Sequence, residues 1–284
     1  MMRTMLILLL VSTHCFGDVV IANQTFTSAA DDCLTVVANT VLLNDNIGPC
    51  HGVGVHVIGS GVEIVNSYIH DTAGVGVLVD NANNTHISGG AIERVATGVY
   101  AYQSQGVSVL GVTFGVLKGP MPRGQCVQFN EVTGPGNRVM GNWCQGATAD
   151  SFNLYKSEGT AASPITIANN TVPSGSINHS SCGIILGDQG GAYQTAIGNR
   201  LTDPGSCGIG VAGGHDIAVT NNTIAGAQSP VTNVGLYVWA QGGVPCSNIT
   251  ASGNTVNWVN AGGERNRVWN GGNCGDIAGW DKNQ

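Results

Sequence analysis

Lys156 stands out among the ionisable residues in the middle of this chain, because the sequence contains only three lysines. It directly follows Tyr155 and lies between the carboxylic acids Glu131 and Asp188. A carboxylate neighbour raises the pKa of a lysine, whereas desolvation or a nearby cation lowers that pKa and makes the amine a base. The alternating charges therefore predict either a proton-transfer site or a simple salt-bridge ladder, and the sequence leaves both open.

A repeat positions these residues. A five-residue motif recurs roughly every 26 residues, with a small residue first and apolar residues second and fourth. Apolar residues at alternate positions predict a β-strand with one buried face, so the third and fifth residues of each motif point outward. The motif begins at Gly52, Gly74, Gly98, Cys126, Ser151, Gly183, Gly208 and Gly235.

A second motif follows the first in each repeat. It is a short alternating strand that ends in Gly or Asn and leads into another apolar residue, as in residues 165–172, 217–224 and 249–256. Two or three short strands per repeat leave no room for a helix, which predicts an all-β, single-stranded parallel β-helix, a solenoid of about nine coils from residue 30 onward. One asparagine per repeat falls in register, which predicts an internal amide ladder of Asn142, Asn170, Asn199, Asn222 and Asn254.

The composition agrees with a solenoid of tight turns. The chain of 284 residues contains 43 glycines and 42% hydrophobic residues, whereas only 10% of its residues are charged. Its formal net charge of −7 argues against a nucleic-acid partner, because nucleic-acid binding requires basic patches.

The first residues have the pattern of a secretory signal. Arg3 precedes an apolar run over residues 5–11, and small residues follow as far as Gly17. We expect a signal peptide over residues 1–17 and a β-helix domain over 18–284, secreted to an extracellular or periplasmic location and without membrane contact after cleavage. No later apolar run is long enough to span a bilayer.

Eight cysteines remain outside the signal segment, and this even number favours disulfides in an exported protein. Cys182 and Cys207 precede the motif glycine in adjacent coils, and stacked strands lie within the Cα range of a disulfide. We predict that the cysteines pair in sequential order, as 33–50, 126–144, 182–207 and 246–274.

This pattern resembles the right-handed parallel β-helix superfamily of pectate lyases and related polysaccharide lyases, epimerases and hydrolases. The resemblance covers about residues 30 to 283 and depends on the repeat rather than on a catalytic signature. It implies a polysaccharide-active protein. Lyases of this superfamily commonly use calcium to neutralise a uronate carboxylate and Lys or Arg as the base.

The outward positions change character in the middle of the array. Glycine or small residues occupy them in several coils, as at Gly210 and Ala212, but three adjacent coils carry aromatic and amide side chains there. A long insert over residues 117–124 delivers Arg123 beside them. We predict a sugar-binding cleft lined by Tyr100, Tyr102, Gln128, Asn130, Asn153, Tyr155 and Lys156, with Glu131, Asp188, Arg123 and, further along, Trp239.

The first functional hypothesis is a lyase that cleaves a uronate-containing glycan by β-elimination. This chemistry needs a carboxylate neutraliser, a base for the C5 proton and an acid for the leaving oxygen. Lys156 would be the base, with Arg123 or Tyr155 as acid or positioning group. Calcium would be the cofactor, held through oxygen by Asn130, Glu131 and Asp188.

The sequence leaves other functions open. A glycoside hydrolase would use two carboxylates drawn from Glu131, Asp150 and Asp188, and a uronate C5-epimerase would use parts similar to those of the lyase. A non-catalytic glycan-binding or surface protein would need no catalytic group. In each case the expected partner is a polysaccharide, acidic in the lyase case, and the protein is expected to be a monomer. The aromatic stretch over residues 268–280 is predicted to cap the open end of the solenoid.

Overall fold

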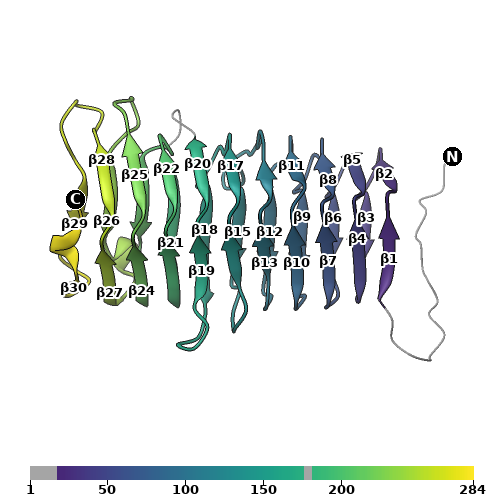
Figure 1. The fold of residues 1–284 in the computed structure, drawn as a ribbon, viewed down its shortest axis with the longest axis horizontal. Coiled ribbons are helices and arrows are strands. Elements are labelled where there is room, and N and C mark those ends of the chain that lie inside the picture. The colour runs from purple at the N-terminus through teal and green to yellow at the C-terminus, as the bar shows by residue number, and fades with distance from the viewer. Residues whose placement is uncertain (1–17, 176–180) are drawn as a thin grey trace.

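The computed structural model describes residues 18–175 and 181–284, which form a right-handed parallel β-helix of about ten coils. The coils stack in sequence order, so the two ends of the chain lie at opposite ends of the stack (Figure 1). The predicted fold is confirmed, although strands already begin at Val19, ahead of the first five-residue motif. The predicted signal peptide at residues 1–17 lies outside the described residues.

Each coil contributes strands to three parallel columns, in which every strand pairs with its counterpart in the next coil. The column that matters most for function is called the site sheet. It consists of β3 (Leu34–Val36), β6 (Val55–Val57), β9 (Val77–Asp80), β12 (Val99–Tyr102), β15 (Val127–Asn130), β18 (Phe152–Glu158), β21 (Cys182–Ile197), β23 (Cys207–Val211), β26 (Val234–Val238) and β29 (Val268–Asn270).

Two further columns complete the coils, and the long strand β21 takes part in the first of them as well as in the site sheet. That column holds β1 (Val19–Ala22), β4 (Thr40–Leu43), β7 (Val62–Val65), β10 (Thr85–Ser88), β13 (Ser108–Leu110), β16 (Arg138–Met140), β19 (Ile165–Ala168), β24 (Gly214–Thr220), β27 (Cys246–Ser252) and β30 (Ile277–Ala278). The last column holds β2 (Thr25–Ser28), β5 (Asn46–Cys50), β8 (Tyr68–His70), β11 (Ala91–Glu93), β14 (Thr113–Phe114), β17 (Trp143–Gln145), β20 (Thr171–Ser174), β22 (Arg200–Thr202), β25 (Thr223–Gly226) and β28 (Thr255–Trp258).

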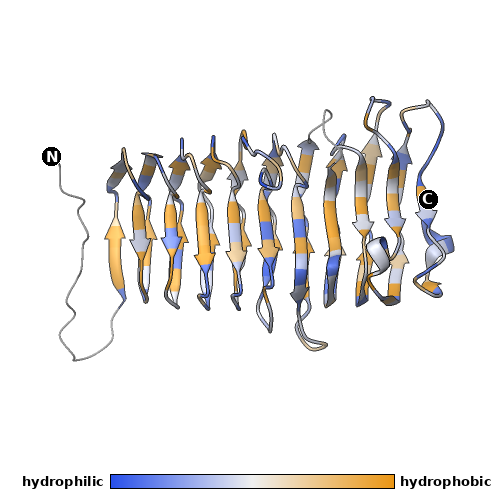
Figure 2. Ribbon diagram, turned by 180° about the vertical axis from the view of Figure 1, so that it is seen from behind, coloured by the Kyte–Doolittle hydropathy of each residue, from blue (hydrophilic) through white to orange (hydrophobic). Residues whose placement is uncertain are grey.

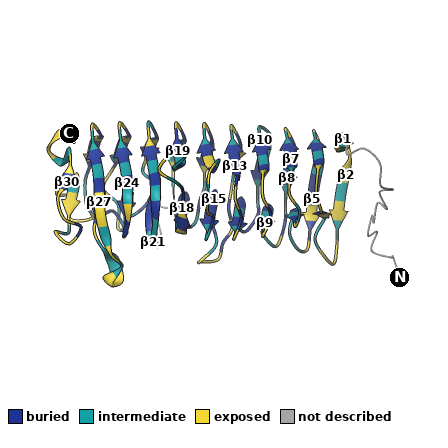
Figure 3. Cartoon of the chain, turned by 90° about the horizontal axis from the view of Figure 1, so that it is seen from below, coloured by how far each residue is buried: buried dark blue, intermediate teal, exposed yellow. Residues whose placement is uncertain are grey.

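The alternation of the sequence explains the interior. Apolar and polar bands succeed one another along the strands (Figure 2), and buried residues recur from coil to coil (Figure 3). Val55, Val77, Val99 and Val127 stack in one internal row, and each is at most 1% exposed. β-Branched residues suit this stack because their restricted side chains pack well on a pleated surface.

The predicted asparagine ladder is present inside the solenoid. Asn142 Nδ2 donates to Asn170 Oδ1 over 2.9 Å, and the same bond repeats from coil to coil through Asn199, Asn222 and Asn254. It continues to Asn283 over 2.8 Å, one residue beyond the predicted set. Because each buried amide finds a partner in the next coil, the ladder stabilises the stacking.

All four predicted disulfides are confirmed, as Cys33–Cys50, Cys126–Cys144, Cys182–Cys207 and Cys246–Cys274. Cys182 and Cys207 are register partners on β21 and β23, with their Cα atoms 4.5 Å apart. This bond therefore joins neighbouring coils, as the stacking geometry predicts.

Helical structure in the described residues consists of two short 3-10 turns, η1 (Gln241–Gly243) and η2 (Trp280–Lys282). No helix in residues 18–175 or 181–284 combines the length and apolar character that a membrane crossing requires. The predicted C-terminal cap is only partly correct. Trp280 packs against the core, but residues 268–270 form the strand β29, which places Trp269 on the outward face of the site sheet.

Candidate active site

Register along the site sheet brings the third residue of each motif into one outward row. Tyr100 lies beside Gln128, which lies beside Asn153 in the next coil. The row continues through the sequence Ile185, Gly210, Tyr237 and Trp269. The polar residues predicted to form a cleft and the small residue Gly210 are therefore neighbours on one surface.

The fifth residues form a second outward row, and here the structure corrects the predicted alignment. Asp188 pairs with Tyr155 and not with Lys156, because the register shifts within β21. Gly187 adopts a left-handed φ of +63°, a conformation that glycine adopts without steric cost, and takes up the extra residue. Asp188 therefore follows Asn130 and Tyr155 in the second row.

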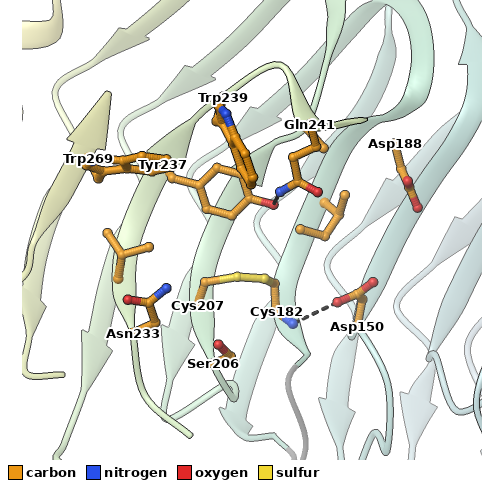
Figure 4. A pocket seen from close by; sticks show the side chains of 13 residues that line it. Asp150, Cys182, Asp188, Ser206, Cys207, Asn233, Tyr237, Trp239, Gln241 and Trp269 are labelled. Carbon is orange, nitrogen blue, oxygen red and sulfur yellow. Dashed lines mark hydrogen bonds between the residues drawn. A yellow bond between two sulfur atoms is a disulfide. The ribbon is translucent and has the colours of Figure 1, made fainter. Parts of the chain in front are cut away.

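A cavity of about 330 Å³ opens on the site sheet next to this bulge. Asp150 and Asp188 lie on one side of it, while Tyr237, Trp239 and Trp269 lie on the other (Figure 4). The Cys182–Cys207 disulfide also lines the cavity.

Small residues create this hollow. A Cβ atom on Gly210 would lie 2.3 Å from Tyr237 Cζ, so the tyrosine ring occupies the space that a side chain there would fill. Ala212 leaves further room between the strand that carries Asp188 and the segment that carries Trp239. Neither position carries a functional group in the sequence. Nevertheless, the absence of a side chain at Gly210 makes room for the Tyr237 ring, and the small side chain of Ala212 leaves the cavity open.

The two aspartates share one amide. Asn153 Nδ2 donates to Oδ2 of Asp150 and to Oδ2 of Asp188, over 3.0 Å in each case. The two acceptor oxygens are therefore at most about 6 Å apart. The backbone N–H of Cys182 donates to the other oxygen of Asp150 over 2.7 Å, which holds that carboxyl group against the strand.

The surroundings of Asp150 and Asp188 raise the pKa values of both carboxyl groups. Burial raises the pKa of Asp150 to about 6, against the hydrogen bonds from Cys182 and Asn153, and the charge of Asp188 raises it further. Burial also raises the pKa of Asp188. No lysine or arginine lines the cavity in the described residues, so no cation offsets the repulsion between the two carboxylates. One protonated and one ionised carboxyl group can therefore coexist at about pH 6.

The opposite wall presents aromatic surface. Tyr237 is 7% exposed, its hydroxyl accepts a hydrogen bond from Gln241 Nε2 over 2.7 Å, and burial raises its pKa. Trp239 and Trp269 are 39% and 44% exposed and meet edge to face with their ring centroids 5.5 Å apart. Exposed indole faces beside a polar pair form a surface on which a sugar ring can stack.

Other predicted residues form a connected patch beside the cavity, called the amide patch (Tyr100, Tyr102, Arg123, Gln128, Asn130, Tyr155 and Lys156). The Arg123 guanidinium stacks over the Tyr100 ring at 4.1 Å, and Tyr100 accepts a hydrogen bond from Asn130 Nδ2 over 2.7 Å. Lys156 Nζ lies 5.3 Å from the centre of the Tyr155 ring.

The predicted salt-bridge ladder is not formed. None of Glu131, Lys156 and Asp188 belongs to an ion pair within residues 18–175 and 181–284. Lys156 is exposed and has a left-handed backbone at φ 47°, and Glu131 accepts a hydrogen bond from Gln103 Nε2 over 2.8 Å. With this backbone conformation, Glu131 contacts Gln103 and Lys156 lies over Tyr155.

The structure thus brings together Asp188, Asn153 and Trp239 from the predicted set and adds four residues to them. Asp150 is already a candidate hydrolase carboxylate in the sequence, and Tyr237 continues the same outward face as Trp239, whereas Gln241 and Trp269 are not predicted there. A bulky aromatic residue opposite a glycine in neighbouring coils is the signal that identifies Tyr237. Gln241 and Asp150 lie outside the five-residue motif, so the repeat does not place them.

A family model described as periplasmic copper-binding protein (NosD) matches residues 34–258. The chain belongs to the NosD family. A search of curated proteins finds no significant match.

Solved structures similar to this NosD-family chain are also β-helix proteins. The Dettilon tailspike protein has a TM-score of 0.55 and 14% identity, covering 93% of this chain, which spans 59% of the tailspike protein's length. A mutant of the periplasmic alginate epimerase AlgG has a TM-score of 0.52 and 10% identity, with 91% of this chain and 76% of the other covered. At these identities the similarity shows the fold alone.

Proposed function

We propose that this NosD-family chain is a polysaccharide-active enzyme that hydrolyses a glycosidic bond at Asp150 and Asp188. The observation that carries the proposal is the pair of half-buried carboxyl groups held by Asn153 in a cavity with an aromatic wall. Glycoside hydrolysis requires two carboxyl groups of different protonation next to the scissile bond. The fold shared with an alginate epimerase and a tailspike protein is compatible with a glycan substrate.

The roles follow from the environments of the two groups. Asp150, with its pKa raised to about 6, donates its proton to the leaving glycosidic oxygen. Asp188 acts in its ionised form, as the nucleophile that bonds to the anomeric carbon while the leaving oxygen takes the proton of Asp150. Water, deprotonated by Asp150, then breaks the bond between the sugar and Asp188. Because about 6 Å is the largest possible distance between these two oxygens, the pair falls short of the separation of about 6.5–9.5 Å in inverting enzymes and is compatible with that of about 5–5.5 Å in retaining ones. We therefore expect retention of anomeric configuration.

A panel of polysaccharides tests this proposal. Purified protein is incubated with each glycan, and new reducing ends are measured together with the absorbance of unsaturated uronate. Reducing ends without that absorbance mark hydrolysis, and Asp150→Asn or Asp188→Asn is expected to lower kcat about 10²–10⁴-fold. Asp276→Asn, at an exposed position outside the cavity, is the matched control. Hydrolysis that survives both cavity substitutions would refute the assignment.

Elimination of a uronate is the second candidate, because the chain provides the two cations that it needs. Lys156 as base and Arg123 or Tyr155 as acid lie in the amide patch, one to three coils from the cavity. An acidic polysaccharide would then react over the patch, and unsaturated products would appear in the same panel. C5-epimerisation would invert the sugar without cleavage, and a glycan-binding protein would bind without turnover.

A metal requirement has weaker support in the residues. Asn130, Glu131 and Asp188, predicted to hold calcium, contact different partners, namely Tyr100, Gln103 and Asn153. This scattered set does not fit one ion, and we derive no step through calcium. A chelator arm in the glycan panel tests the prediction directly.

Copper, named in the family's description, also lacks a matching set of ligands in the described residues. The cysteines there are all paired in disulfides, and no group of three or more His, Cys, Asp or Glu side chains is arranged to hold a metal. His56 contacts Asp32 through one ring nitrogen and faces Asp80 through the other, so these groups do not converge. We derive no step through copper.

We infer that the protein works in the periplasm or outside the cell. The family description, the predicted signal peptide and four disulfides support this location, because disulfides persist in oxidising compartments. A monomer is the expected state, and the size of the exported protein in solution tests it.

A further inference from the structure

The two cations of the amide patch lie on one side of the cavity. Arg123 and Lys156 stand over Tyr100 and Tyr155, while the cavity itself contains two aspartates and no lysine or arginine among the described residues. The chain as a whole contains only ten lysines and arginines against seventeen acidic residues. Two cations in one patch of such an acidic chain therefore form a distinct electrostatic feature.

Neither cation is neutralised within the described residues. The side chains of Arg123 and Lys156 form no ion pair there, and their recorded contacts are with aromatic rings. Glu131 is the acidic group that precedes Lys156 by one coil, but its carboxylate is bonded by Gln103. A cation stacked on a ring keeps its charge available to an anion in solution.

The floor between the two cations has unused hydrogen-bonding capacity. Gln128 Oε1, Asn130 Oδ1 and Asn153 Oδ1 are buried and have no hydrogen-bond partner among residues 18–175 and 181–284, and Gln128 and Asn153 are only 7% and 4% exposed. Such acceptors are costly to leave unpaired, which indicates that a donor is supplied from outside the chain. Hydroxyl groups of a sugar are donors of this kind.

We propose that the glycan is a mixed polymer, with a neutral unit in the cavity and an acidic unit over the amide patch between Arg123 and Lys156. This inference rests on the proposed function, since it assumes that the cavity holds a sugar. A uronate in the cavity would face Asp150 and Asp188 without a cation, whereas a neutral ring can stack on Trp239. Asn130 lies two coils from Asp188, so the acidic group binds about 10 Å from the site of cleavage.

Equilibrium binding to immobilised glycans tests this arrangement without relying on turnover. Dextran and cello-oligosaccharides represent neutral glycans, polygalacturonate and alginate are acidic at every unit, and hyaluronan and xanthan combine neutral and acidic units. We expect binding to the mixed set, with a Kd that rises with salt. Binding confined to either of the other sets, or to none of the three, overturns the proposal.

Charge removal provides the second arm. The double variant Arg123→Gln with Lys156→Gln is expected to weaken binding of the mixed glycan at least tenfold and to flatten its salt dependence. Arg200→Gln with Lys282→Gln, which removes one exposed arginine and one exposed lysine outside the site sheet, is the matched control. Unchanged affinity in the first variant overturns the inference. If the Asp188→Asn variant still hydrolyses the glycan while binding still depends on Arg123 and Lys156, the proposed function is refuted but this inference is not.

Discussion

Two neighbouring regions of the site sheet use the same backbone for different purposes. The amide patch on β12, β15 and β18 is filled with large polar and aromatic side chains that contact one another, as Tyr100 does with Asn130. In the region over β21, β23 and β26, the middle coil has the small residues Gly210 and Ala212 in the corresponding places, and a cavity opens there. Adjacent large aromatic, amide and charged side chains thus form a filled surface, whereas small residues between larger ones leave room for a pocket.

This difference shows why side-chain type alone is a poor guide to a site on a repeat scaffold. Stacked coils place the same position of each motif about 4.8 Å apart, so a large residue in one coil covers the adjacent position in the next. Tyr237 covers Gly210 in this way. The predictions that follow break or sharpen the comparison between the two regions.

Displacing the Tyr237 ring, which lines the cavity, from its place over Gly210 is expected to have the largest effect. Gly210→Val would place side-chain atoms where the Tyr237 ring lies, since even a Cβ would come within 2.3 Å of Tyr237 Cζ. We expect loss of measurable turnover and a decrease of about 1–3 kcal/mol in the free energy of unfolding. Activity assays and chemical denaturation measure the two effects. Gly262→Val, whose added Cβ would have only Asn260 Oδ1 within 4 Å, at 3.3 Å, is the control, and equal losses in both variants would contradict the explanation.

The next largest effect is expected in the pH dependence of turnover and stability. This dependence distinguishes the cavity from the amide patch, because the carboxyl groups with raised pKa values line the cavity. With the pKa of Asp150 raised to about 6, the rate should fall as pH rises above that value, up to about tenfold per pH unit, because the acid loses its proton. The same shift makes the folded state bind more protons than the unfolded one. The contribution of Asp150 to the free energy of unfolding is therefore fully present below about pH 4 and is lost as pH rises through about 6.

Asp150→Asn should remove this stability change, which thermal unfolding between pH 4 and 7 would show. A pH profile for unfolding that is the same in the variant and the natural sequence would mean that Asp150 has an ordinary pKa.

A smaller effect is expected at the aromatic wall. Trp239→Ala removes a 39% exposed indole that faces the cavity, which should raise KM roughly 2–10-fold with little change in kcat. Trp143→Ala, at a 43% exposed indole on β17 outside the site sheet, is the matched control. A decrease in kcat with unchanged KM would show that Trp239 acts on the transition state rather than on binding.

The smallest effect on the chemical step is expected in the amide patch. Lys156→Gln should leave kcat within about twofold, because Lys156 lies over Tyr155 and outside the cavity, and any loss should be in KM. Steady-state kinetics at two salt concentrations measure both. If the variant has no turnover while substrate binding and thermal stability stay intact, Lys156 is the base and elimination displaces hydrolysis as the function.

The sequence by itself determined the coils, the disulfide pairs and the asparagine ladder. Each depends on residues that recur at a fixed period, such as Cys182 with Cys207 or Asn142 with Asn170, and stacking converts that period directly into contact. The sequence also predicted Asp188, Asn153 and Trp239 as site residues, and they lie at the cavity because they point outward from strands or strand ends that the motif identifies.

Only the tertiary structure decided where the cavity lies and which carboxyl groups face each other. The one-residue shift at Gly187 moves Asp188 away from Lys156, and Asp150 enters the site from outside the motif to share the amide of Asn153. A bulge and a hollow depend on how a residue fits against its neighbour one coil away. That fit is a property of side-chain volume in three dimensions, which the period of the sequence does not encode.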